Sequence, residues 1–85
     1  MSEKYRLMIY FAIATMHFYR DDLVITDKNA AVESMVLANE KVINRIKEEA
    51  LNLFKYELSF HQICIAMYSY LHDSQLVDNT KAAIK

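Results

Sequence analysis

The chain of 85 residues contains neither glycine nor proline. The turns that join β-strands commonly need glycine for a positive φ or proline for a preset φ, so this composition argues against a β-rich fold and predicts an all-α protein. Phosphate-binding loops, dinucleotide fingerprints and nucleophile elbows also use glycine to bring the backbone close to a ligand. The absence of glycine therefore excludes these classes of enzyme site.

The remaining composition indicates a single small domain over residues 1–85, in a reducing compartment. One cysteine cannot form an intrachain disulfide, which favours a cytoplasmic location. The longest apolar stretch, Leu7 to Tyr19, is shorter than the about 20 residues that cross a bilayer as a helix. Arg20 follows it directly, where a signal peptide would need small residues. We therefore expect a cytoplasmic protein without a membrane span.

Capping residues and apolar spacing predict the helices. Ser2 caps a first helix, whose apolar residues point in every direction around the axis, as in a helix buried on all sides. Ser59 and Gln62 form the pattern of a capping box, and the apolar pair Leu58 and Ile63 flanks it as a hydrophobic staple. The predicted fold is a bundle of three main helices over about 3–20, 28–57 and 60–72, with a short C-terminal helix over about 74–84.

The long middle segment raises the question of whether it is one helix. Written as heptads, Val32, Asn39, Ile46 and Leu53 fall on one column, which places a polar amide in an apolar seam. The best-attested use of such an amide is to set the register between paired helices. Two alternatives stay open: Asn39 is a surface residue, or the helix breaks near Asn39 or Asn44.

The sequence offers little for catalysis or metal binding. His61 and Cys64 are spaced to ligate one ion together, but no second pair accompanies them. Cys64 lies among apolar neighbours, which is typical of an inert, buried thiol. We expect no catalytic residue, no metal and no cofactor, and therefore a non-enzymatic protein.

Association is the remaining function class. Hydrophobic residues make up 54% of the chain even without glycine, above the roughly 45–50% of soluble domains, while a domain this small buries only about 60–65% of its unfolded surface. Tyrosine and methionine are also enriched at interfaces, although a tyrosine-rich core would look similar. We expect a homodimer that completes the bundle and an adaptor, inhibitor, immunity-type or regulatory factor. The candidate interface residues are Tyr10, Phe11, Phe18, Asn39, Ile46, Leu53, Phe54 and Tyr68.

The alternative function is nucleic-acid binding, by a regulator of the transcriptional, biofilm or stress type. Lys41, Arg45 and Lys55 lie broadly together on the long helix. Glu40 and Glu48 interleave with them, and the net charge of the chain is −1, so a solvated helix face explains the same pattern.

Overall fold

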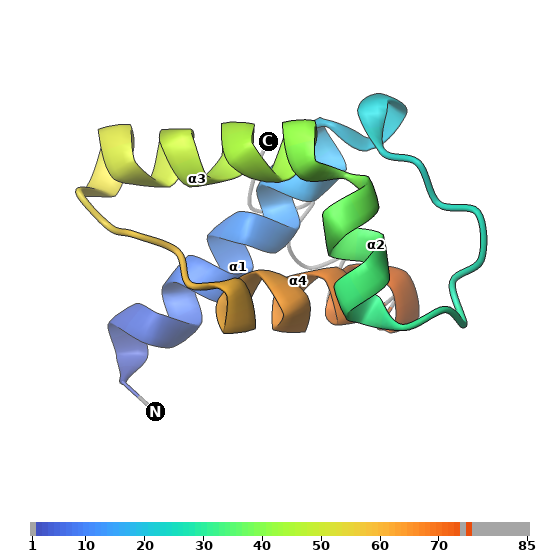
Figure 1. Cartoon of the computed structure of the whole chain (residues 1–85). Coiled ribbons are helices and arrows are strands. Elements are labelled where there is room, and N and C mark those ends of the chain that lie inside the picture. The colour runs from blue at the N-terminus through green and yellow to red at the C-terminus, as the bar shows by residue number, and fades with distance from the viewer. Residues whose placement is uncertain (1, 74, 76–85) are drawn as a thin grey trace.

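The computed structural model describes residues 2–73 and 75, and every regular element in this part of the chain is helical (Figure 1). The predicted all-α class is therefore confirmed. The elements are α1 (Glu3–Phe18), a short 3₁₀ turn η1 (Arg20–Asp22), α2 (Val32–Ala38), α3 (Glu40–Phe54) and α4 (Phe60–His72). The C-terminal helix expected over 74–84 falls outside the described residues, apart from residue 75.

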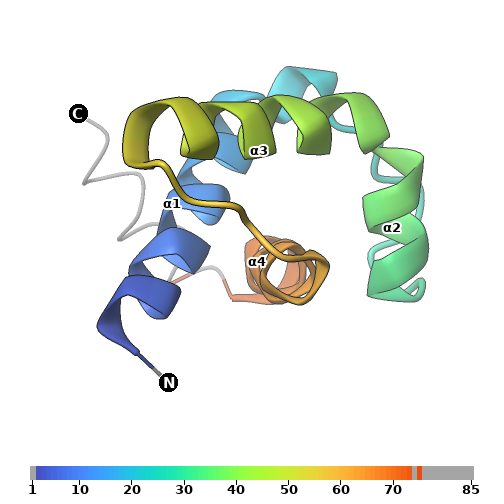
Figure 2. The ribbon, with the colours of Figure 1, turned by 60° about the vertical axis from the view of Figure 1, so that its left-hand side comes forward.

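The helices enclose one core from several sides. Figures 1 and 2 show α3 along one side of the molecule and α4 along the other, with α1 crossing between them. The short helix α2 turns away from α3 and runs toward α4 at one end of the molecule. Accordingly, α4 packs against both α1 and α2, and α3 packs against α1.

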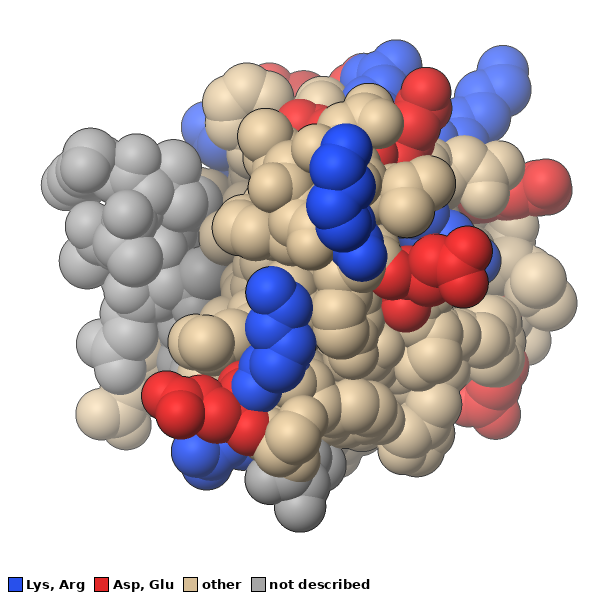
Figure 3. Space-filling model, turned by 90° about the vertical axis from the view of Figure 1, so that its left-hand side faces the viewer, with Lys and Arg blue, Asp and Glu red and all other residues tan. Residues whose placement is uncertain are grey.

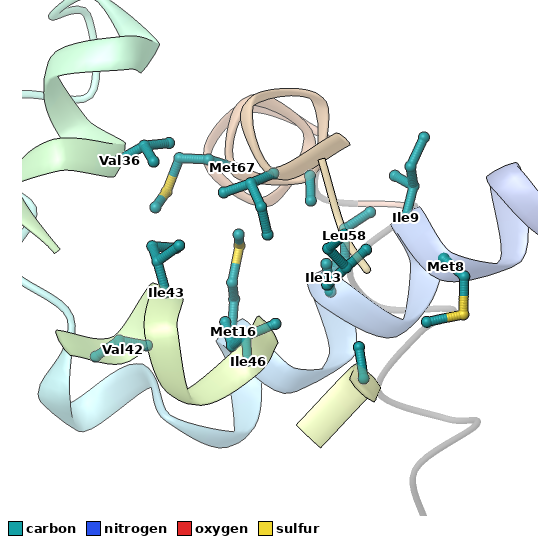
Figure 4. Packing of buried hydrophobic residues seen from close by; sticks show 14 of the residues in the cluster. Met8, Ile9, Ile13, Met16, Val36, Val42, Ile43, Ile46, Leu58 and Met67 are labelled. Atoms are coloured by element: carbon teal, nitrogen blue, oxygen red, sulfur yellow. The ribbon is translucent and has the colours of Figure 1, made fainter. Parts of the chain in front are cut away.

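The expected single helix over 28–57 is wrong in its length, and the open alternative of a break near Asn39 is correct. The helical segment ends at Ala38 and restarts at Glu40, with Asn39 at φ −113° and ψ 33° between them. Apolar side chains explain the change of direction, because Val36 of α2 faces α4 whereas Ile43 of α3 lies nearer α1 (Figure 4). The break lets α2 pack against α4 while α3 packs against α1.

The ends of this segment also differ from the prediction. Residues 28–31 precede α2 as a turn, and Asp27 stabilises that turn, because its carboxylate accepts a hydrogen bond from the Asn29 N–H at 2.9 Å. At the other end α3 stops at Phe54, where Lys55 takes the left-handed conformation with φ 55° and ψ 38°. Such a residue closes a helix C-terminus, and glycine usually holds the position.

The predicted starts of α1 and α4 are confirmed. The Ser2 hydroxyl accepts a hydrogen bond from the Tyr5 N–H at 3.1 Å. Ser59 and Gln62 form a capping box with both reciprocal hydrogen bonds, and α4 has the expected bounds. Gln62 is 1% exposed and its Nε2 also donates to the Tyr5 carbonyl and the Tyr56 hydroxyl, which ties α4 to the start of α1.

Charged side chains of both signs occur on the face shown in Figure 3. On the face in Figure 3, Lys and Arg side chains alternate with Asp and Glu side chains across a broad uncharged area. No helix of residues 2–73 and 75 is both long and apolar enough to span a membrane.

The core draws side chains from all four helices and from the loop before α4. Met16, Ile46 and Met67 are fully buried and point toward one another from α1, α3 and α4 (Figure 4). The expectation that α1 is buried on all sides does not hold for the single chain. One face of α1 is in the core, whereas Leu7 and Phe18 on the other face are 52% and 67% exposed.

Candidate functional site

The eight residues predicted for an interface divide into two groups. Asn39 and Ile46 are buried in the interior of the chain. The other six are exposed or half-buried: Tyr10, Phe11, Phe18, Leu53, Phe54 and Tyr68. The structure places five of these six on two separate apolar surfaces, one between α1 and α3 and one between α2 and α4. Tyr10, which is 42% exposed on α1, belongs to neither surface.

The α1–α3 face consists of Phe11, Ala14, Phe18, Leu53 and Phe54. The first three follow one another by three and four residues, so they form one stripe along α1. The rings of Phe11 and Phe54 meet edge to face, with centroids 5.1 Å apart, which joins the stripe to the end of α3. Leu53 is 65% exposed and lies one helical turn after Glu49, which lines a hollow together with Phe11 and Phe18. The result is a mainly aromatic surface with two strongly exposed side chains, Phe18 and Leu53.

A shallow hollow of about 260 Å³ lies within this face, lined by Phe11, Ala14, Thr15, Phe18 and Glu49. The Thr15 hydroxyl is satisfied within α1, because it donates to the Phe11 carbonyl at 2.7 Å. The hollow therefore offers an apolar floor with one carboxylate at its edge.

Polar groups form the border of the α1–α3 face. The Tyr19 hydroxyl donates to the Glu49 carboxylate at 2.8 Å, and this hydrogen bond raises the pKa of Tyr19 above 10.0. The Arg45 guanidinium lies 5.0 Å from the Tyr19 ring centroid, and the Lys4 ammonium lies 5.6 Å from the centre of the Phe54 ring. An apolar centre inside a polar rim is the usual anatomy of a protein–protein interface.

The α2–α4 groove is the second apolar surface, with a volume of about 430 Å³. Phe60, Cys64 and Tyr68 follow one another at intervals of one helical turn, so they form a stripe along α4. Phe60 and Tyr68 are 47% and 59% exposed. The complete lining consists of Val32, Glu33, Phe60, His61, Cys64, Ile65, Tyr68 and Ser69.

Sequence reasoning selected only Tyr68 from this groove. Phe60 and Cys64 were missed because α4 is apolar over most of its circumference, which hides the outward stripe among core residues. The sequence signal that could identify them is the four-residue spacing of Phe60, Cys64 and Tyr68 on a helix that contains no Asp, Glu, Lys or Arg.

The chemistry of the groove is limited. Cys64 is partly exposed, contrary to the expected full burial, but desolvation raises the pKa of its thiol above 9.0. The thiol is therefore protonated at neutral pH and a poor nucleophile. His61 and Cys64 both line the groove. Within the described part of the chain, no three His, Cys, Asp or Glu residues are grouped so that they could hold a metal ion.

The two buried candidates have partners within the chain. Ile46 is 0% exposed and lies in the core. Asn39 is 4% exposed, and its Nδ2 donates to the carbonyls of Val24 and Met35, which uses both of its hydrogens. We therefore do not carry Asn39 and Ile46 into the interface proposed below.

The candidate nucleic-acid residues Lys41, Arg45 and Lys55 are all exposed. Arg45 stacks on Tyr19 and forms an ion pair with Asp22 at 3.9 Å. Lys55 stands at the closing turn of α3, about 20 Å along the helix from Lys41.

Comparison with protein families, with curated proteins and with solved structures finds no match for this chain. Its fold and surfaces define it by class alone, as a small all-α protein that carries two apolar surfaces on one helical core.

Proposed function

We propose that this protein is a non-enzymatic interaction protein that binds another protein and self-associates as a homodimer. Its role would be that of an adaptor, inhibitor, immunity-type or regulatory factor. The observation that carries the proposal is the α1–α3 face, where Phe18 and Leu53 remain 67% and 65% exposed beside the Phe11–Phe54 ring pair.

Exposure of this kind favours a binding role on energetic grounds. Full burial of an aliphatic or aromatic side chain is worth about 1.5–3 kcal/mol, so a partner that covers Phe18 and Leu53 gains from each. Contiguous apolar patches with polar rims mark interaction sites on small proteins more often than isolated apolar residues do. The rim contributes both charges, from Lys4, Arg45 and Glu49, so we expect a partner with an apolar segment flanked by charged or polar groups.

The non-enzymatic part of the proposal rests on the side chains present in the two hollows. The α2–α4 groove brings Cys64 near His61 and Glu33, but the raised pKa of the thiol opposes nucleophilic chemistry at neutral pH. The hollow of the α1–α3 face holds a single carboxylate.

The surface charges give less support to nucleic-acid binding. A nucleic-acid site requires a continuous basic surface. Here the guanidinium of Arg45 is engaged by Tyr19 and Asp22, and acidic groups interrupt the basic ones. We therefore retain protein binding as the favoured function.

Affinity capture from the native host, followed by binding measurements with the purified partner, tests the proposal. We expect Phe18→Glu and Leu53→Glu to weaken binding of the captured partner at least tenfold. Asn44→Glu adds the same charge at an exposed position of α3 that is not part of the α1–α3 face and serves as the matched control. Equal binding by all four proteins would reject the α1–α3 face as the binding site.

A further inference from the structure

One side of α1 faces away from the core and carries a stripe of apolar side chains. Leu7, Tyr10 and Ala14 follow one another by three and four residues along the helix. Leu7 is 52% exposed, Tyr10 is 42% exposed and Ala14 is half-buried. His17, three residues after Ala14, continues this outer stripe to the C-terminal end of α1. A stripe of this kind is the surface on which an amphipathic helix packs.

The end of α4 lies beside the end of the outer stripe. The rings of His17 and Tyr70 have their centroids 6.3 Å apart. At the other end of the two helices, Gln62 Nε2 donates to the Tyr5 carbonyl at 3.1 Å. The helices α1 and α4 therefore run in the same direction. A chain that turns back at the end of α4 passes along the outer stripe toward the start of α1.

The sequence after α4 has the apolar spacing of a matching helix. The C-cap of α4 is Asp73, and the backbone of Gln75 is helical again. As a helix, residues 76–85 would measure about 15 Å, which is also the length of α1 from Leu7 to His17. Apolar side chains and one threonine recur in this segment at helical spacing, at Leu76, Val77, Thr80, Ala83 and Ile84.

Covalent attachment favours this segment over a separate chain as the occupant of the outer stripe. Isolated helices shorter than about 12–15 residues are marginal in water, so a helix of this length needs an apolar surface to pack on. A segment joined by a short connection has an effective concentration in the millimolar range. A second copy or another protein must compete with that concentration, whereas the attached segment meets the stripe at every protein concentration.

We propose that residues 74–85 form a helix that packs antiparallel to α1 on the outer stripe. In this arrangement Val77 lies beside Ala14, and Ile84 lies beside Leu7, because both helices advance by the same rise per residue. Of the outer stripe, only Ala14 also belongs to the α1–α3 face. The inference therefore does not rest on the proposed function.

Amide hydrogen exchange of the whole chain, measured by NMR, tests the docking. We expect the amides of residues 77–84 to exchange at least about tenfold more slowly than in an isolated peptide of the same sequence. Tyr10→Glu should remove this protection, because the packed segment would bury an unpaired carboxylate. Tyr68→Glu makes the same substitution at an exposed tyrosine of the α2–α4 groove and should leave the protection unchanged. The core amide of Met67 should stay protected in both variants, which shows that the fold is intact.

Engineered disulfides test the direction of the segment. In a Cys64→Ser background, Leu7→Cys combined with Ala83→Cys should form an intramolecular disulfide in oxidised glutathione. Leu7→Cys combined with Val77→Cys is the matched pair, in which the second thiol lies about 9 Å further along α1. We expect its disulfide yield to be at least fivefold lower.

Several results would overturn the proposal. These are exchange of residues 77–84 at the rate of the peptide, protection that survives Tyr10→Glu, protection that Tyr68→Glu removes instead, and equal disulfide yields in the two pairs. Protection that rises with protein concentration would assign the outer stripe to a second copy and would also overturn it. Partner binding through Phe18 and Leu53 is measured separately, so a failure of the docked segment leaves the α1–α3 face standing and the reverse also holds.

Discussion

The side-chain amide of Asn39 pairs with the backbone of Val24 on both sides. Asn39 Oδ1 accepts from the Val24 N–H at 2.7 Å, and Nδ2 donates to the Val24 carbonyl at 3.0 Å. Nδ2 also donates to the Met35 carbonyl at 2.8 Å, one turn back in α2. One side chain thus connects the extended segment after η1 to the junction of α2 and α3.

Replacement of the single side chain of Asn39 should therefore lower the stability of the fold substantially. Asn39→Ala removes three hydrogen bonds and leaves the partly buried N–H and C=O of Val24 without these partners. We expect the free energy of unfolding to fall by about 2–3 kcal/mol, measured by urea denaturation. Asn44→Ala, at an exposed position of α3, should change it by no more than about 0.5 kcal/mol. Similar values for the two variants would mean that the Val24 pairing contributes little.

Replacement of Lys55 by glycine should raise the stability of the fold. Lys55 adopts φ 55° without being glycine, and the left-handed region disfavours a Cβ atom. We expect Lys55→Gly to raise the free energy of unfolding by about 0.5–1 kcal/mol. Lys47→Gly, in the interior of α3, should lower it by about the same amount. A loss of stability in Lys55→Gly would indicate that the lysine side chain matters more than the backbone conformation.

The hydrogen bond between Tyr19 and Glu49 predicts a pH dependence above neutrality. It raises the pKa of Tyr19 in the folded chain above the value of 10.0. The bond therefore stabilises the fold fully below pH 10, and this contribution is lost as pH rises through the higher folded pKa. Unfolding in urea between pH 9 and 11 should reveal a decline in stability that is shallower in Tyr19→Phe.

Absorbance at 295 nm measures the same ionisation directly. Subtracting the Tyr19→Phe titration from that of the unsubstituted protein isolates Tyr19 from Tyr70, whose pKa is also raised, mainly by burial. Glu49→Gln removes the negative charge next to the phenol and should lower the pKa of Tyr19 toward 10.0. An unchanged pKa in Glu49→Gln would contradict the assigned cause.

Phe11 and Phe18 belong to the same face, but their replacement by alanine should lower the stability of the fold by different amounts. Phe11 is half-buried and its ring packs against Phe54, so Phe11→Ala should cost about 2 kcal/mol. Phe18 is 67% exposed, and Phe18→Ala should cost less than about 1 kcal/mol. Thermal denaturation of both variants checks this order, and equal losses would mean that Phe18 is packed in solution. Phe18 is therefore the better position for testing partner binding.

Local signals in the sequence account for the starts of α1 and α4. Ser2, and Ser59 with Gln62, satisfy the first N–H groups of their helices through side chains no more than three residues away. The absence of glycine and proline likewise pointed to the helical class, because it removes the residues that tight turns between strands need.

Long-range contacts explain where the sequence-based description failed. The break at Asn39 is stabilised by Val24, 15 residues earlier in the chain, and the heptad column that included Asn39 ends at that break. Lys55 closes α3 in a conformation for which its own residue type gives no signal.

For the candidate site, too, the sequence predicts one part and the packing of the helices decides the other. Apolar composition predicted that surface would be left over, since a chain of this size cannot enclose so many apolar side chains. Periodicity could not identify which faces stay open on α1 and α4, because both helices carry apolar residues almost all around. That choice depends on which neighbouring helix covers each side, and it is made only when α1, α2, α3 and α4 pack together.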